Sequence, residues 1–558
     1  MAGSLCWILL IALAAGFAPN ARAAKLTDTE HTNIEEPRPK DVPGDAQLEA
    51  SGAVIGDVLI DVQNIFNEGD PRENNGLFRL ADRLHMRTRV SAIRAQLLFR
   101  SGDRYQARKL AETERNLRLL AYVYDAHVVP VRFHDGKVDV RVITHDVWTF
   151  SPGLSFGRTG GTSSTNVNIQ DSNLFGSGKS LKFEHLEGVE RTSDGVLWSD
   201  PNTFGSRWTT AAAYFDSSDG YQRALQIARP FFELDARWSV TLAASDYERT
   251  VSRYSFGEIV DQFRDDETSY TLSAGVSTGL HDGWVMRWLG GIQYDRSLFG
   301  AAPSTMTPAL QLPPDRIVSY PFVGFDLLQD YYQKLYDQNQ IGRTEDFYFG
   351  TEITGSVGLS NKQFGADLDA IMLAASARKG FAFEESHQQL LLTSAFTSRI
   401  EAQRARNLIA TATASYYWRW QPDWMLYANL NATVTDALDP DAQLQVGGDN
   451  GLRGYPLRFE SGSSSAVFTL EQRFYTDWYP FRLVRVGGAV FGDVGRTWGA
   501  AVIGNSDPGL LRDVGFGLRL GNTRSGLGNV LHIDLAFPLK QIYGIKRVQF
   551  LVQTLQSF

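Results

Sequence analysis

Most of the chain, from Trp148 onward, alternates apolar and polar residues over short stretches. Between Ala428 and Val434, the even-numbered residues are apolar and the residues between them are Asn or Thr. Residues 514–520 and 531–537 alternate in a similar way. A two-residue period predicts β-strands that have one apolar face. Clusters of Gly, Asp, Asn and Ser separate these stretches, which indicates turns between antiparallel strands.

The alternation alone does not say what covers the apolar faces. About 410 residues without a helical pattern would make an unusually large soluble sandwich, whereas outer-membrane barrels consist of many strands of about 10 residues around a polar lumen. A mean hydropathy of −0.22 agrees with strands that are half lumenal. Aromatic clusters such as residues 416–420 are typical of interfacial girdles. We therefore predict a transmembrane antiparallel β-barrel over residues 149–558, with about 16 strands and up to 20.

Residues 52–148 show a different pattern, which predicts a small separate domain. Its apolar residues recur at strand spacing in 54–62, 122–128 and 138–142, and at helical spacing in 90–97 and 107–120. Asp135-Gly136 is a tight hairpin signal between the last two strands. The expected order is β-α-α-β-β, with a polar segment, residues 67–88, inserted after the first strand.

The N-terminal residues predict export from the cytoplasm. An apolar stretch, Cys6–Phe17, precedes Ala21-Arg22-Ala23, a small-x-small pattern that signal peptidase cuts. Residues 1–23 are therefore predicted to be a signal peptide, and the polar, proline-containing residues 24–51 a disordered periplasmic linker. Cleavage would remove the only cysteine, and a chain without thiols suits the oxidising periplasm or outer membrane of a Gram-negative cell.

Composition excludes several classes of protein. Acidic residues (63) outnumber basic ones (54), which argues against binding to nucleic acid. No apolar run after residue 20 approaches the roughly 20 residues that a membrane-spanning helix needs. The single cysteine excludes disulfide frameworks and cysteine-rich zinc sites, and the nine histidines lack metal-ligand spacing. We predict no metal and no cofactor.

Two short strings look catalytic but lack the required context. Gly153-Leu154-Ser155-Phe156-Gly157 matches the nucleophile elbow of hydrolases, which must join a strand to a helix. Here Gly160-Gly161 follows and predicts a hairpin. Gly178-Lys179-Ser180 ends like a phosphate-binding loop, but Asn173 replaces its leading glycine. An outer-membrane phospholipase would need Ser and His together on the outer face of the barrel. The sequence indicates no such pair, so we predict no enzymatic activity.

Three motifs carry a resemblance to a known family. In chain order they are Asn173-Leu174-Phe175-Gly176-Ser177-Gly178, then Gly447-Gly448 followed by Leu452-Arg453-Gly454-Tyr455, and Phe491-Gly492-Asp493-Val494-Gly495. With these motifs the chain resembles the BamA/TamA superfamily of outer-membrane proteins, which includes the two-partner-secretion transporters. The β-α-α-β-β unit is similar to a POTRA domain of that family. The resemblance covers about residues 52–558.

The resemblance implies an outer-membrane protein with its N-terminal domain in the periplasm and 16 barrel strands. It implies three kinds of partner: the lipid bilayer, client or exported polypeptides, and the barrel-assembly machinery that reads the terminal Phe558. The chain has room for one POTRA unit, whereas the insertases of the family have several. The expected function is therefore protein insertion into, or transport across, the outer membrane. The alternatives are a passive pore or surface-antigen barrel, and the transporter half of a two-partner secretion pair.

In the family, the sixth extracellular loop carries the motif arginine, here Arg453, and folds back into the lumen. The glycines around it would permit a tight backbone path: Gly447, Gly448, Gly451 and Gly454. Strand parity turns Glu471 and Asp493 inward, because their apolar neighbours point outward. A guanidinium forms paired hydrogen bonds with a carboxylate, so we predict that Arg453 binds both acids. The alternative is a solvated loop arginine. We call Arg453, Glu471 and Asp493 the lumenal lock.

Overall fold

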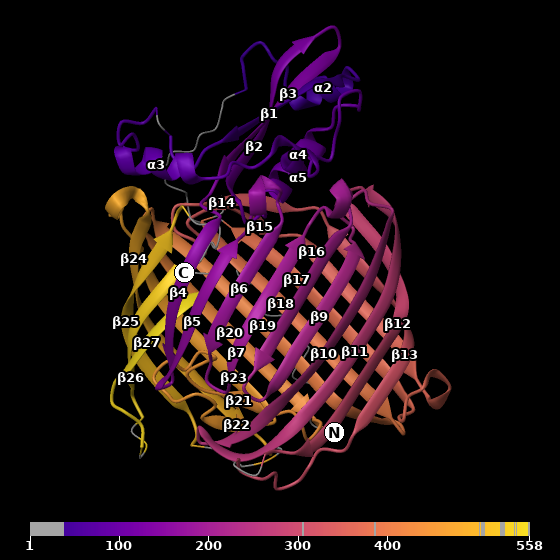
Figure 1. Ribbon diagram of the computed structural model, residues 1–558, viewed down its shortest axis with the longest axis vertical. Coiled ribbons are helices and arrows are strands. Elements are labelled where there is room, and N and C mark those ends of the chain that lie inside the picture. Colours follow the sequence, from indigo (N-terminus) through magenta and orange to yellow (C-terminus); the bar gives the residue numbers. More distant parts are fainter. Residues whose placement is uncertain are drawn as a thin grey trace.

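The computed structural model describes residues 38–555, except 68, 304–305, 384–386, 502, 504–507, 525–529, 541 and 543. The predicted signal peptide and Phe558 lie outside the described residues. The chain forms an N-terminal domain, residues 38–148, above one end of a large β-barrel (Figure 1). In the described part of the chain, no helix is both long and apolar enough to cross a membrane.

The N-terminal domain packs helices against a three-stranded sheet. Its elements are α2 (Asp45–Ala50), β1 (Val54–Gln63), α3 (Gly76–Leu84), α4 (Val90–Arg94), α5 (Ala107–Arg118), β2 (Val123–His134) and β3 (Lys137–Asp146). The sheet order is β1-β3-β2, with β1 parallel and β2 antiparallel to β3. Ile93, Leu117 and Val140 lie in its apolar core.

Two details of this domain differ from the prediction. Residues 45–50, predicted to belong to a disordered linker, form α2, and Leu48 is completely buried in the domain core. The polar segment 67–88 contains α3, which Asn75 caps by accepting a hydrogen bond from the backbone N–H of Phe78. Both helices are short, with six and nine residues. Short helices show few turns of periodicity, so the polar composition hid them.

Twenty described strands close the barrel, which is the upper bound of the predicted range and more than the sixteen that the resemblance implies. In chain order they are β4 (Phe150–Thr159), β5 (Thr162–Asp171), β6 (Ser180–Glu187), β7 (Thr192–Asp200), β8 (Thr209–Ser217), β9 (Gly220–Arg229), β10 (Trp238–Ser255), β11 (Glu258–His281), β12 (Trp284–Ala301), β13 (Arg316–Gln329), β16 (Thr351–Ser360), β17 (Ala370–Phe383), β18 (Gln388–Glu401), β19 (Arg404–Gln421), β20 (Trp424–Asp436), β23 (Ser464–Tyr475), β24 (Val484–Trp498), β25 (Leu511–Asn522), β26 (Val530–Pro538) and β27 (Gln549–Leu555). Each strand pairs antiparallel with the next, and β27 returns to β4.

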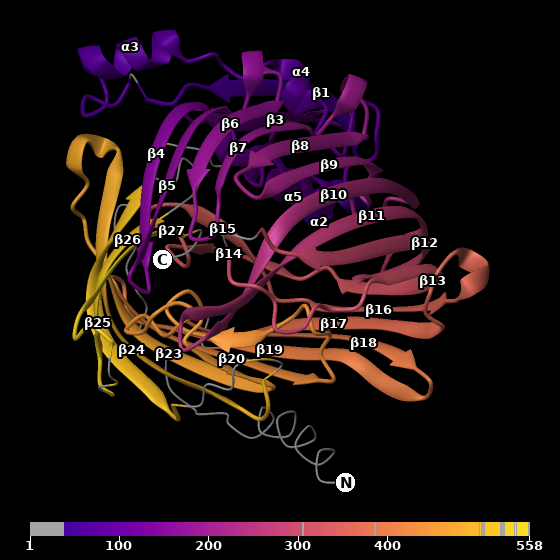
Figure 2. The same ribbon diagram turned by 60° about the horizontal axis from the view of Figure 1, so that its bottom comes forward.

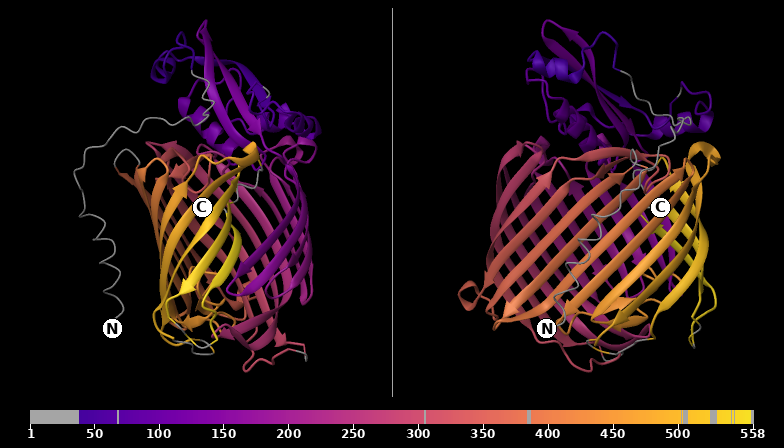
Figure 3. Two further views of the ribbon diagram at one scale, coloured as in Figure 1. Left: turned by 90° about the vertical axis from the view of Figure 1, so that its left-hand side faces the viewer. Right: turned by 180° about the vertical axis from the view of Figure 1, so that it is seen from behind.

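The barrel has two distinct ends (Figure 3). We call the end below the N-terminal domain the domain end, and the opposite end the loop end. β4 begins at the domain end, three residues after β3 finishes. Because the strand number is even, β27 finishes at the domain end as well.

The outward face of the barrel is apolar and the lumenal face is polar. Large apolar side chains that remain exposed on the outward face include Ile169, Phe183, Trp288, Ile292, Val323, Leu470, Phe516 and Leu518. Trp418, Trp420 and Trp424 are also exposed there, in agreement with an aromatic girdle. Tyr417, from the same predicted cluster, is instead buried on the lumenal side.

Two short hairpins lie apart from the barrel sheet. Strands β14 (Tyr332–Tyr336) and β15 (Thr344–Tyr348) form one of them, between β13 and β16 at the domain end. Strands β21 (Leu444–Val446) and β22 (Glu460–Gly462) form the other, in the long connection from β20 to β23 at the loop end. Figure 2 shows β14 and β15 inside the ring of barrel strands. Both ends of the lumen therefore contain inserted chain.

Candidate functional site in the barrel lumen

The connection between β20 and β23, residues 437–463, folds into the lumen from the loop end. Leu452 and Tyr455 are completely buried, and they pack with Val446, Phe459 and Leu511. The Tyr455 hydroxyl donates a hydrogen bond to the carbonyl of Arg512 (2.8 Å). In this barrel the connection is the eighth loop at the loop end, not the sixth, and it remains the third from the C-terminus.

The structure brings the three residues of the lumenal lock together. The Nε and Nη2 groups of Arg453 donate to the two carboxylate oxygens of Asp493, each over 2.8 Å. Its Nη1 donates to Glu471 over 2.7 Å. The Asp493 side chain has no exposed surface, and that of Arg453 is 11% exposed. Arg453 thus makes the bidentate contact that arginine geometry permits and lysine geometry does not.

Further charged groups surround the lock. Thr469 donates its hydroxyl to Asp493 (2.8 Å), and Arg473 donates to the free oxygen of Glu471 (3.0 Å). Arg519 pairs with Asp534, which also lies 3.9 Å from Arg453. The lumen wall here is therefore a buried ionic network, in which the side chains of Arg519 and Asp534 have almost no exposed surface. Removing one member of such a network leaves others uncompensated.

The glycines of the loop act mainly through close approach. Gly451 is the loop glycine with a positive φ, at 105°. At Gly448 an added Cβ would lie 2.5 Å from the Tyr455 carbonyl, and at Gly454 it would lie 2.6 Å from the Cβ of Asp513. Gly447 is equally crowded, by the carbonyl of Pro456 at 2.5 Å. The tight path expected from the sequence thus exists, but steric crowding rather than backbone dihedral requires most of these glycines.

The strand motif of residues 491–495 has a physical explanation. The Phe491 ring lies under the guanidinium of Arg453, with the Cζ atom 3.4 Å from the ring centroid. Asp493 accepts the paired hydrogen bonds, and Gly495 leaves room for the side chain of Leu452, whose Cδ2 atom would be 3.0 Å from an added Cβ. Every second residue of this part of β24 therefore contacts the loop: Phe491 stacks on it, Asp493 binds it, and Gly495 leaves room for it.

The first motif, residues 173–178, binds the N-terminal domain to the barrel. Asn173 is completely buried in the turn between β5 and β6. Its amide donates to the hydroxyl of Thr88 (2.7 Å), which in turn donates to Asp146 (2.8 Å). The carbonyl of Gly176 accepts a hydrogen bond from the N–H of Arg89 (2.8 Å). The motif is thus a docking turn.

A second docking turn was missed in the sequence. Residues 200–206, Asp-Pro-Asn-Thr-Phe-Gly-Ser, repeat the Asp-x-Asn-x-Phe-Gly-Ser pattern of residues 171–177. Phe204 and Phe175 share a left-handed conformation, each with φ of 54°. Arg207, just beyond the second turn, donates to the carbonyls of Ala95 (2.7 Å) and Leu97 (2.6 Å). The internal repeat was the signal that could have revealed this turn.

Comparisons with solved structures give matches of low sequence identity, with TM-scores below 0.5 for the three that follow. No family model and no curated protein matches this sequence. CdiB from Escherichia coli is 13% identical, with a TM-score of 0.46 and coverage of 90% of this chain and 76% of that chain. CdiB from Acinetobacter baumannii is 14% identical, with a TM-score of 0.43 and coverage of 90% and 74%. BamA from Haemophilus ducreyi lacking POTRA domains 1–3 is 12% identical, with a TM-score of 0.37 and coverage of 89% and 84%. The barrel architecture of this chain is therefore established by the pairing of its own strands, described above.

Proposed function

We propose that this chain is an outer-membrane β-barrel of the BamA/TamA type that inserts proteins into the outer membrane or passes them across it. Its N-terminal domain then lies in the periplasm as a single POTRA-like domain. The loop end faces the cell exterior. Three features support this assignment: the outward apolar face, the short register of the described seam between β27 and β4, and a domain with an available sheet edge over one mouth.

The outward face suits a lipid environment. Side chains such as Trp288, Val323 and Phe516 are more than half exposed on the barrel wall. Exposing so many large apolar groups to water is unfavourable, whereas hydrocarbon accepts them without cost. A closed barrel also satisfies the strand hydrogen bonds that lipid cannot satisfy.

The seam between β27 and β4 is the observation that carries the proposal. Among the described residues it has one registered pair, Val552 with Arg158. Every other pair of neighbouring barrel strands has at least seven, as β26 has with β27. A short seam costs little to part, and parted edges can pair with the strand of a client protein. A passive pore has no use for such a weak closure.

The N-terminal domain offers a second edge. Among the described strands, β1 pairs with β3 alone, and one isolated bridge joins Val54 to Arg104. Leu59, near the middle of β1, is 48% exposed. Strand addition at this edge would hold many client sequences, because backbone hydrogen bonds carry most of the contact. The lumenal lock would meanwhile keep the inserted loop in place while the seam opens.

A disulfide across the seam tests the proposal. Residues 24–558 contain no cysteine, so Arg158→Cys with Val552→Cys introduces a single pair at registered positions. If the protein is an insertase, oxidation should abolish assembly of its clients and reduction should restore it. The matched control is Ile533→Cys with Val552→Cys, which links β26 to β27 and leaves the seam free.

The same variants separate the alternatives. A transporter of a two-partner secretion pair sends its client through the lumen, so the seam disulfide should leave secretion intact. Depletion of the protein, followed by comparison of the outer-membrane and secreted proteomes, gives the complementary result. Loss of several barrels indicates an insertase, and loss of one exoprotein indicates the transporter. No change in either proteome would refute client handling and leave the passive barrel.

A further inference from the structure

The hairpin at the domain end crosses the lumen. We call residues 330–350 the plug hairpin. It leaves the wall between β13 and β16, and its tip residue Ile341 packs in a buried cluster with Tyr417, Met425, Tyr475 and Val530. These partners lie on β19, β20, β23 and β26, so the tip reaches the side of the barrel away from its root.

The tip holds the wall mainly through polar contacts. Gln338 donates its amide to Gln389 (2.7 Å), and Tyr417 donates its hydroxyl to Asn339 (3.1 Å). Arg419 donates to the carbonyl of Tyr336 (3.3 Å). Ile341 is the one apolar side chain of the tip in the described cluster of this region. A hydrogen bond between neutral groups contributes less net free energy than one between charged groups, so the Gln338 and Asn339 contacts hold the tip more weakly than the lumenal lock holds its loop.

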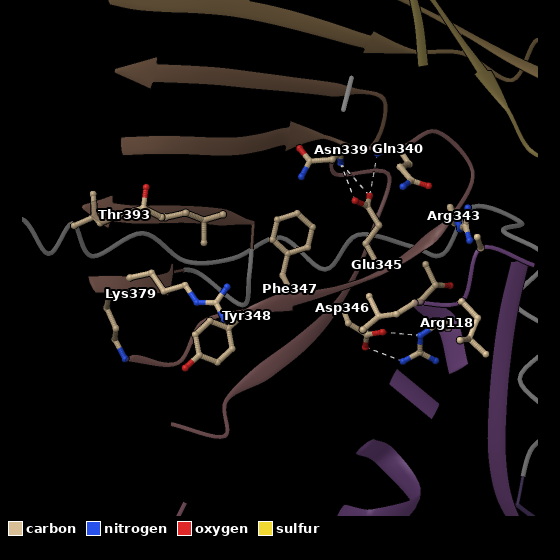
Figure 4. Close-up of a pocket in the computed structure, with 17 residues that line it drawn as sticks. Arg118, Asn339, Gln340, Arg343, Glu345, Asp346, Phe347, Tyr348, Lys379 and Thr393 are labelled. Atoms are coloured by element: carbon tan, nitrogen blue, oxygen red, sulfur yellow. Dashed lines mark hydrogen bonds and ion pairs between the residues drawn. The ribbon is translucent and has the colours of Figure 1, made fainter. Parts of the chain in front are cut away.

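The N-terminal domain holds the hairpin from the other side. Arg118, at the end of α5, donates two hydrogen bonds of 2.7 Å to the carboxylate of Asp346. Lys334 pairs with Glu114, also on α5. Arg343 donates to the carbonyl of Val123 on β2 (2.9 Å). The hairpin thus bridges the domain and the wall. Figure 4 shows the contact between Arg118 of the domain and Asp346 of the hairpin.

Space is available next to the hairpin. A cavity of about 730 Å³ lies between β15, the segment that follows α5, and strands β17 and β18 (Figure 4). Arg118, Glu345, Phe347 and Lys379 are among the residues that line it. The hairpin thus has free space on this side, although its strand β15 touches the wall where Arg378 of β17 lies over the Tyr348 ring, 4.3 Å from the centroid.

We propose that the plug hairpin closes the domain end of the pore, and that the N-terminal domain latches it there through Arg118 and Asp346. Movement of the domain away from the barrel removes the latch. The hairpin can then swing about its two roots, near Asp330 and Gly350, into the adjoining space. A ligand that draws the domain away would open the pore without touching the barrel.

Single-channel conductance of the purified full chain in planar bilayers tests the plug. Replacing residues 337–343 by Asn-Gly, a two-residue hairpin turn, removes the tip and keeps the Tyr336–Thr344 pair. We expect a larger and continuously open conductance. The shortened variant is folded if its migration on gels changes on heating as that of the wild type does. A folded variant with the wild-type conductance would overturn the proposal.

A point variant tests the latch. Asp346→Asn keeps the shape of the side chain and removes its charge, so the open fraction should rise at least about tenfold, because charge-assisted hydrogen bonds are among the strongest. The matched control is Arg132→Ala. It breaks the Arg132–Asp139 ion pair, which lies within the N-terminal domain and away from the hairpin. Equal open fractions for Asp346→Asn and the control would refute the latch.

A reversible crosslink excludes misfolding as an explanation. Gln338→Cys with Gln389→Cys joins the tip to the wall at side chains that already hydrogen bond. In the Asp346→Asn background, the oxidised protein should stay closed and the reduced protein should open. Equal conductance in both states would show that the hairpin does not gate the pore. The measurement needs no client, so its outcome is separate from that of the proposed function.

Discussion

Two inserted segments occupy the lumen from opposite ends, and they are held in different ways. The loop of residues 437–463 binds the barrel wall alone, through a buried arginine and two buried acids. The plug hairpin binds two bodies, the wall and the N-terminal domain. A segment held by one rigid body leaves only when that body deforms. A segment shared between two bodies is released when they part, so the loop is the static element and the hairpin the movable one.

The largest expected effect concerns the static element. Arg453→Ala should lower the free energy of unfolding by roughly 3–5 kcal/mol, the cost of breaking a buried ion pair, because it leaves the buried acids Glu471 and Asp493 without this cation. The barrel should still insert, but the loop should become sensitive to protease. Denaturant unfolding in detergent and limited proteolysis measure both effects. The control is Arg404→Ala, an exposed residue at the start of β19. Equal stability of Arg453→Ala and wild type would remove the contrast between the two segments.

The wall that holds both segments can be tested next. Phe396→Arg on the outward face should cost roughly 2–4 kcal/mol in lipid, whereas Thr397→Arg on the lumenal face should cost far less. Both residues lie near the middle of β18, and Thr397 is exposed to the lumen. Asp534 and Leu535 are a poorer pair for this test, because Asp534 is buried against Arg519. Folding yield in vesicles decides the result, and equal yields would invert the assigned faces.

The parts of the lock should behave as one unit. Asp493→Asn should resemble Arg453→Ala, and the double variant should add little, with a coupling energy of roughly 0.5–3 kcal/mol. Arg453→Lys should restore only part of the loss, because lysine cannot donate the paired hydrogen bonds to Asp493. A double-mutant cycle by denaturant unfolding measures this. Fully additive losses would mean that the loop is not held through this pair.

The smallest effect is a pH dependence of the movable element. Burial raises the pKa of Glu345 in the plug hairpin to about 7 from 4.5, although three backbone N–H groups of the turn donate to its carboxylate. A raised pKa favours the protonated, packed hairpin, so this stabilisation is complete below about pH 4.5 and is lost as the pH rises through 7. Openings should be more frequent at pH 8 than at pH 5. Glu345→Gln should abolish that difference, and an unchanged pH dependence in this variant would place its source elsewhere.

The lock could be predicted from the sequence because its parts are local. A short motif located Arg453, and the two-residue period set the inward face of Glu471 and Asp493. The plug hairpin could not be predicted in this way. Its strands, Tyr332–Tyr336 and Thr344–Tyr348, are five residues long and show no regular alternation, and so short a pattern does not indicate whether a strand joins the ring or lies inside it. The resemblance implied sixteen ring strands, fewer than the twenty described strands that close the barrel.

Other elements escaped prediction for a different physical reason. Helix α2 contributes a single buried residue, Leu48, whose core cluster combines near neighbours such as Ala53 with residues far away in the chain such as Val140. The docking turns gain their role from contacts with the N-terminal domain, which no local pattern encodes. Segments whose structure depends on distant contacts are those that sequence periodicity describes least well.

The even number of barrel strands has a consequence for biogenesis. In the proposed orientation, β4 begins and β27 finishes on the periplasmic side, so the N-terminal domain and the last described strand both lie on the side from which an exported chain arrives. The described N-terminal domain then does not have to cross the bilayer, and only the connections at the loop end must be carried over. The domain can therefore fold first in water, and the ring can close beside it afterwards.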